Sequence, residues 1–117
     1  MNRSDVQSWL DRYVEAWVSG DRDAIGDLFS EDATYRYHPY DEPVTGRAAI
    51  VESWFEDPDE PGSFEARYEP YAVDGDRAVA VGVSAYRSGD IYDNVFTLRF
   101  DGDGRCSEFT EWFMKRP

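Results

Sequence analysis

Three side chains of this sequence could carry out proton transfer: Glu111, Tyr13 and His38. Glu111 lies two residues from both Phe109 and Phe113, in a segment where alternate residues share one face of a strand. A carboxyl group that faces an apolar cavity has a raised pKa, and a pKa of about 6 to 7 suits a general acid or base. The alternative is a strand carboxylate in a surface ion pair or at a dimer seam.

Tyr13 and His38 each have a functional and a structural interpretation. Tyr13 could donate a hydrogen bond to an oxygen of a ligand, or it could be a helix-face tyrosine whose hydroxyl reaches water or a backbone carbonyl. His38 has the side-chain type whose ordinary pKa lies closest to neutral pH, which suits a base. The strand alternation places it opposite Tyr37, and Pro39 follows directly, so a rim or structural role is favoured.

Other residues could bind the ligand that Glu111 acts on. Asn94 lies on the same face as Phe96 and, in the simplest hairpin register, lies opposite Glu111 and orients its carboxylate. Aromatic and hydroxyl groups are plentiful enough to line a pocket. The candidate ligand-binding residues are Trp17, Tyr35, Tyr37, Trp54, Asn94, Phe96 and Phe109. Composition alone is equally compatible with a solid aromatic core.

Two helices are predicted at the start of the chain. Ser4 and Gln7 form a capping-box pattern, and apolar residues then recur at spacings of three and four until Gly20 ends the helix. Asp21 can cap a short second helix whose apolar side extends to Phe29. Together they form a helical hairpin.

Thr45 is predicted to cap a third helix over residues 46–56. Alternating patterns predict the strands, at residues 33–38, 63–73, 77–87 and 91–100 and in the segment after the Asp101–Gly104 turn. Pro70 indicates a bulge or an edge position. The order α-α-β-α-β-β-β-β predicts one α+β domain, residues 1–117. About three helices would pack on a curved, mostly antiparallel sheet that wraps around them and leaves an internal pocket.

Composition limits the class of protein. The chain has 117 residues, and its aromatic content of 16% favours a folded domain despite a formal charge of -13. No apolar run reaches the roughly 18 residues of a membrane span, and no secretory signal opens the chain. The prediction is a cytoplasmic protein that does not bind membranes.

Few metal-binding or nucleic-acid-binding features are present. One cysteine, Cys106, and one histidine leave no thiolate or imidazole zinc cluster, so neither a metal nor a cofactor is expected. The acidic excess is dispersed along the chain, and the basic residues are eleven arginines and a single lysine, so no basic stripe for nucleic acid is expected. Trp112 and Met114 make the second face of the last strand apolar, which predicts a homodimer.

Three phrases in order give the chain a family resemblance: RYVEAWVSGDRDAIGDLFSEDATY (residues 12–35), PVTGRAAIVESWF (residues 43–55) and FDGDGRCSEFTEWFM (residues 100–114). With them the chain resembles the nuclear transport factor 2-like superfamily, in its SnoaL-like and ketosteroid-isomerase-like branches. The resemblance covers almost the whole length and implies a cone-shaped fold. It does not fix the activity, because this fold hosts enzymes as well as binding and structural proteins.

The resemblance transfers only some catalytic positions. In ketosteroid isomerases a first-helix tyrosine and a protonated aspartic acid form an oxyanion hole, and another aspartate is the base. Tyr13 takes the tyrosine position, whereas the base position falls on Tyr37, beside His38, and the acid position falls on Phe96. Steroid-type isomerisation by that mechanism is therefore not expected.

Limonene-epoxide hydrolases offer a second partial match. Their last strand carries a catalytic aspartate, and Glu111 in the phrase TEWF takes its place. The arginine and second aspartate of that site have no counterpart in residues 79–85.

Three hypotheses follow. The first is an acid/base enzyme, of isomerase, dehydratase, cyclase or hydrolase type, acting on a small apolar molecule that contains oxygen. The second is a non-catalytic module that binds a ligand in the same pocket, and the third is a structural homodimer. A homodimer is expected under all three.

Overall fold

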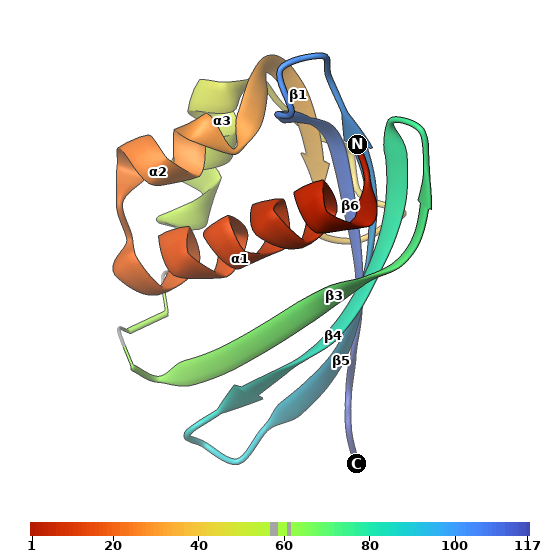
Figure 1. Cartoon of the computed structure of the whole chain (residues 1–117). Coiled ribbons are helices and arrows are strands. Elements are labelled where there is room, and N and C mark those ends of the chain that lie inside the picture. The colour runs from red at the N-terminus through yellow and green to blue at the C-terminus, as the bar shows by residue number, and fades with distance from the viewer. Residues whose placement is uncertain (57–58, 61) are drawn as a thin grey trace.

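The computed structural model describes residues 1–56, 59–60 and 62–117. The three helices lie on one side of a curved, open sheet of six strands, and α1 runs across its concave face (Figure 1). The elements are α1 (Arg3–Ser19), α2 (Arg22–Asp27), β1 (Phe29–Arg36), β2 (Val44–Thr45), α3 (Arg47–Trp54), β3 (Phe64–Asp74), β4 (Arg77–Tyr86), β5 (Ile91–Phe100) and β6 (Cys106–Lys115). This α+β architecture confirms the predicted fold class, with β2 as an added strand.

The first two helices begin and end through local capping. Asn2 caps α1 by accepting from the backbone N–H of Asp5, whose side chain accepts from the backbone N–H of Asn2. The predicted box at Ser4 is wrong, because Ser4 lies inside the helix. Gly20 ends α1 at φ 66° and Asp21 caps α2, and both were predicted.

Two predicted helix boundaries are wrong for tertiary reasons. The second helix ends before Phe29, because Phe29 pairs with Cys106 as the start of β1. Thr45 does not cap α3; it pairs with Thr34 in β2, and Gly46 takes the cap position without a side-chain hydrogen bond. Both segments are short, so sheet pairing outweighs the local helix signal.

The strands follow the order β2-β1-β6-β5-β4-β3. Only β1 and β6 pair in parallel. This pairing places the chain's first long strand against the first half of its last strand. The remaining pairs are antiparallel, and β3 is an edge strand with a register shift just after Pro70. The predicted bulge or edge position of Pro70 is therefore confirmed.

Apolar side chains of α1 and the concave face of the sheet form the core. Its centre is a stack of aromatic rings in which Tyr35 and Phe109 lie parallel, with centroids 4.3 Å apart. No helix in the described part of the chain is both long and apolar enough to cross a membrane.

Candidate functional site

A cavity of about 870 Å³ lies between the helices and the concave face of the sheet. All three helices and every strand but the short β2 contribute to its lining. The lining residues are Tyr13, Trp17, Val18, Ser19, Gly20, Ile25, Tyr35, Tyr37, Ser53, Trp54, Phe55, Glu56, Asp59, Glu60, Tyr68, Ser84, Tyr86, Ser88, Asp90, Tyr92, Asn94, Glu111 and Phe113.

Glu111 is held at the inner end of this cavity by a chain of hydrogen bonds. Ser84 donates its hydroxyl to Asn94 Oδ1 at 3.1 Å, which directs the amide Nδ2 of Asn94 toward Glu111. Nδ2 then donates to Glu111 Oε2 at 3.0 Å. Because Ser84 and Asn94 are both buried, this chain fixes which carboxylate oxygen is engaged.

The contact between Asn94 and Glu111 is present, but the predicted register is wrong. Glu111 pairs with Phe96, and Asn94 pairs with Phe113. The turn is one residue longer than the simplest register assumes, and an irregularity between Arg99 and Phe100 adds one more residue. The amide therefore reaches the carboxylate diagonally along one face of the sheet.

Burial raises the pKa of Glu111 to about 7. The hydrogen bond from Asn94 and the nearby His38 favour the ionised form and limit the rise. The carboxyl group is therefore close to half ionised at neutral pH.

Tyrosine hydroxyls form a second polar group in the cavity. The hydroxyls of Tyr13 and Tyr35 lie 3.0 Å apart, and the hydroxyl of Tyr37 lies 2.8 Å from that of Ser53. Burial raises the pKa of Tyr13 and of Tyr35 well above the usual value, and the negative charge of Glu111 raises both further. These phenols therefore stay protonated and remain hydrogen-bond donors.

Gly82 makes room for another tyrosine of the cavity. It pairs with Tyr68 on β3, and a Cβ at this position would lie 2.2 Å from the Tyr68 ring and 2.2 Å from the carbonyl oxygen of Arg67. Because side chains in contact are never that close, only glycine lets the Tyr68 ring lie against β4.

The two predicted tryptophans also line the cavity. Trp17 stacks on Phe64 and donates its indole N–H to Asp59 Oδ2 at 3.1 Å. Trp54 packs edge-on against Tyr13, and its indole N–H has no hydrogen-bond partner among the described residues. The Trp54 nitrogen is itself buried, so it is an unsatisfied donor within the wall of the cavity.

Phe96 and Phe109 do not line the cavity, contrary to the prediction. They are 0% and 1% exposed and pack beneath Tyr13 in the aromatic core. The strand alternation correctly put them on the inner face, but α1 covers that part of the sheet. The pocket and the solid core, which composition left as alternatives, occupy different parts of one concave surface.

His38 lies outside the cavity lining. Its Nδ1 lies 2.8 Å from Asp41 Oδ2, and its ring stacks on Tyr40 and leans against Phe113. We therefore assign His38 the rim position and no direct contact with a ligand. Its effect on the site is through the pKa of Glu111.

The described residues contain no group of three or more His, Cys, Asp or Glu side chains placed to hold a metal ion. The expected absence of a metal and of a cofactor stays a prediction. The site chemistry described here uses only carboxyl, amide, hydroxyl and aromatic groups.

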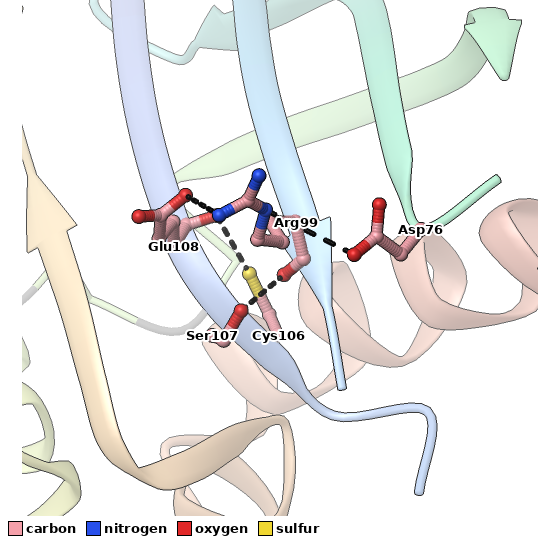
Figure 2. A network of polar contacts seen from close by, with 5 residues as sticks. All are labelled: Asp76, Arg99, Cys106, Ser107 and Glu108. Carbon is pink, nitrogen blue, oxygen red and sulfur yellow. Dashed lines mark hydrogen bonds and ion pairs between the residues drawn. The ribbon is translucent and has the colours of Figure 1, made fainter. Parts of the chain in front are cut away.

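A separate polar network surrounds the other end of β6. Figure 2 shows Arg99 between Asp76 and Glu108, with the thiol of Cys106 donating to the carbonyl oxygen of Glu108 at 3.2 Å. Cys106 is fully buried, and burial raises the pKa of its thiol. A buried thiol far from the thiolate form is a poor nucleophile, so Cys106 has a structural role.

A sequence model of the SnoaL-like domain matches residues 10–109. The chain belongs to the SnoaL-like domain family. The match includes the helical hairpin and most of the cavity wall, but it ends before Glu111.

Two solved structures share the fold of this SnoaL-like domain. An NTF-2-like protein of unknown function from Burkholderia xenovorans LB400 is 23% identical, with a TM-score of 0.74 over 97% of this chain and 88% of that one. A protein from Kribbella flavida DSM 17836, provisionally named a ketosteroid isomerase, is 19% identical, with a TM-score of 0.77 over 98% of this chain and 82% of that one. These likenesses confirm the nuclear transport factor 2-like fold.

Some residues of the SnoaL-like cavity were missed in the sequence. Ser84 lies in a strand whose small and branched residues gave no polar pattern. Tyr86 and Tyr92 lie near a turn, where exposure is the usual expectation. Strand alternation could have found Ser84, because it shares the inner face with Ala80.

Proposed function

We propose that this SnoaL-like protein binds a small, mostly apolar, oxygen-bearing molecule in the cavity and transfers a proton with Glu111. One observation carries the proposal: a carboxyl group with a pKa of about 7 in an aromatic-lined cavity. Near neutral pH such a group is present in both forms, so it can donate or accept a proton.

The hydrogen bonds around Glu111 support a proton-transfer role. Asn94 engages Oε2, and Oε1 has no hydrogen-bond partner among the described residues. A carboxyl group held by one oxygen keeps the other free for a ligand while its orientation stays fixed. Asn94 and Ser84 would therefore act as positioning residues.

The Tyr13–Tyr35 pair would polarise the substrate. Two hydroxyls that share one hydrogen bond leave one proton for another acceptor, such as a ligand oxygen. A neutral donor aimed at an oxygen stabilises the negative charge that develops there when a neighbouring carbon loses a proton. Isomerisation, dehydration and aldol-type cyclisation of carbonyl compounds use such a step, whereas in hydrolysis the same donor would stabilise the charge that forms on oxygen when the bond to it breaks or water attacks.

A non-catalytic binding module with the same cavity is the alternative. The ionisation of Glu111 separates the two functions, because a binding module has no need for a carboxyl group poised near neutral pH. Carbon-13 NMR of the glutamate carboxyl groups, assigned with Glu111→Gln, should give a pKa near 7. An ordinary Glu111 pKa near 4.5 would contradict the catalytic proposal.

Catalysis itself can be followed by hydrogen–deuterium exchange. Cyclic ketones incubated in D₂O should lose α-protons faster with the protein than without it, and Glu111→Gln should lower the rate by about 100-fold or more. Glu108→Gln is the matched control, because Glu108 lies on the same strand and is exposed. Equal losses in both variants would contradict a specific role for Glu111.

We also propose that the outer face of the sheet pairs with a second copy of the chain. Val95 pairs with Trp112 across β5 and β6, and Met114 follows on the same face. Trp112 is 42% exposed and Met114 is 75% exposed, so this face carries apolar surface that a partner would cover.

The expected cytoplasmic location of the protein stays a prediction.

Sedimentation equilibrium gives the direct test of pairing. The wild type should have twice the monomer mass, and Trp112→Lys should shift the mass toward the monomer because it puts a charge in the apolar contact. Tyr71→Lys is the control, because Tyr71 is exposed on the edge strand β3. A monomeric wild type would exclude this interface.

A further inference from the structure

The ionisable groups that line the cavity, apart from its tyrosines, are all acids. They are Glu56, Asp59, Glu60, Asp90 and Glu111. No Lys, Arg or His belongs to the lining among the described residues, although the chain has 12 Lys and Arg residues. The lining therefore carries net negative charge when these acids are ionised, and neutral tyrosine hydroxyls do not cancel that charge.

Most of these acids lack a cationic partner. Asp90 pairs with Lys115 at 3.1 Å, and the partner of Asp59 among the described residues is the neutral indole of Trp17. No ion pair between described residues includes Glu56, Glu60 or Glu111. The negative charge thus remains available to a ligand.

Aromatic rings near the turn between β4 and β5 add a second attraction for positive charge. The Tyr86 and Tyr92 rings meet at 80° with centroids 5.7 Å apart, and Tyr92 meets Phe113 at 70° and 5.9 Å. The π face of an aromatic ring carries partial negative charge and attracts a cation. All three rings line the cavity.

The field of these acids reaches the pocket tyrosines. Asp59 and Glu111 contribute to raising the pKa of Tyr86 to about 12, after the larger effect of burial. Glu111 and Glu56 act on Tyr37 in the same direction. The charges of Glu56, Asp59 and Glu111 therefore act on tyrosines of the cavity wall.

We infer that the ligand of this cavity carries a positive charge: it is a small organic cation of the ammonium type, held by the aromatic faces and the carboxylates. This inference rests on the proposed function, because it names the substrate class of the same site. An organic cation keeps the apolar body that the walls require. Anionic ligands are disfavoured, because no cationic side chain lines the described part of the cavity to pair with them.

Binding of a cation should be coupled to the ionisation of Glu111. The titratable groups near Glu111 are tyrosines and one histidine from α1, from strands β1, β3 and β4, and from the segment after β1: Tyr13, Tyr35, Tyr37, His38, Tyr68 and Tyr86. The tyrosines stay neutral below pH 9, so Glu111 is the inner group whose charge changes between pH 6 and pH 8. Because the charge of His38 acts on Glu111, a His38 variant is needed as a control.

The test compares choline with its neutral carbon isostere, 3,3-dimethyl-1-butanol, by NMR titration of the protein. At pH 8 choline should bind about tenfold more tightly, the range expected for a cation in an aromatic and acidic site. Its Kd should weaken about tenfold from pH 8 to pH 6, because Glu111 takes up a proton, whereas the Kd of the isostere should not weaken.

Variants assign the preference to residues. Glu111→Gln should remove most of the pH dependence and the preference at pH 8, and Glu56→Gln should reduce the preference about twofold. Glu69→Gln makes the same charge change at an exposed position of β3 outside the cavity. It should change neither the pH dependence nor the preference for choline. His38→Gln should keep the pH dependence, and circular dichroism checks that each variant is folded.

The outcomes separate this inference from the proposed function. An isostere that binds as tightly as choline at pH 8 overturns the cation inference, while a Glu111 pKa near 7 in the same samples leaves proton transfer intact. Conversely, a choline preference with an ordinary Glu111 pKa supports a cation-binding pocket and removes the catalytic role. A preference that is unchanged in Glu111→Gln overturns the assignment of Glu111 as the counterion.

Discussion

The start and the middle of strand β6 place an ionisable side chain in different surroundings. Cys106 and Glu111 both have raised pKa values, and burial is the larger cause for each. Cys106 is sealed, with its thiol bonded to a carbonyl oxygen of its own strand. Glu111 lies only five residues further on, but it lines a cavity and is held by Asn94.

The comparison shows that desolvation alone does not make a reactive group. Burial shifts both side chains toward the neutral form, which for a thiol removes the nucleophile. For a carboxyl group the same shift brings the pKa close to working pH, and the cavity gives a ligand access to it. Access, rather than the size of the pKa shift, makes Glu111 the candidate.

The largest expected difference is in chemical access to the sealed end. Cys106 should react with a small thiol reagent at least about a thousandfold more slowly in the folded protein than in urea, because labelling requires unfolding. The rate is measured with a chromogenic disulfide at pH 8. Rapid labelling of the folded chain would show that this end of β6 is open and would break the comparison.

Removing a ring from the sealed part of the inner face should be costly. Phe109→Ala should lower the free energy of unfolding by about 4 kcal/mol, because Phe109 is fully buried among other rings. Phe113→Ala is the matched control on the same strand face, where the ring is 44% exposed. Urea titrations of both variants that gave equal losses would contradict the division between core and cavity.

Glu111→Gln should stabilise the protein at high pH. The carboxyl group has a pKa of about 7 when folded and about 4.5 when unfolded, so the unfolded state binds fewer protons between these values. Wild-type stability should therefore fall by about 3 kcal/mol as pH rises from 4 to 8, and the variant should lack this part of the loss. Urea unfolding at pH 4, 6 and 8 measures it, and parallel curves for both proteins would argue against the raised pKa.

The smallest expected effect concerns the hydrogen bond that tunes Glu111. Asn94→Ala removes a donor that favours the ionised carboxylate, so the pKa of Glu111 should rise by about one unit. Ser84→Ala should raise it less, because Ser84 acts only by orienting the Asn94 amide. Carbon-13 titration measures both, and a fall in pKa after either change would reverse the assigned role of the hydrogen bond.

The sequence by itself determined the elements and the faces of this protein. Capping residues such as Asp21 and the turn at Gly20 act over a few neighbours, and strand alternation sets which side chains share a face. For this reason the α+β order, the edge character of Pro70 and the shared inner face of Asn94 and Glu111 could be predicted.

Only the tertiary structure decided which part of the inner face is open. Phe96 and Phe109 have the same strand pattern as the cavity residues, but the path of α1 across the sheet covers them. Likewise the shift that brings Asn94 diagonally to Glu111 comes from the length of a turn and an irregularity in the ladder. The path of α1 depends on the packing of distant segments, so no local pattern could reveal where the core ends and the cavity begins.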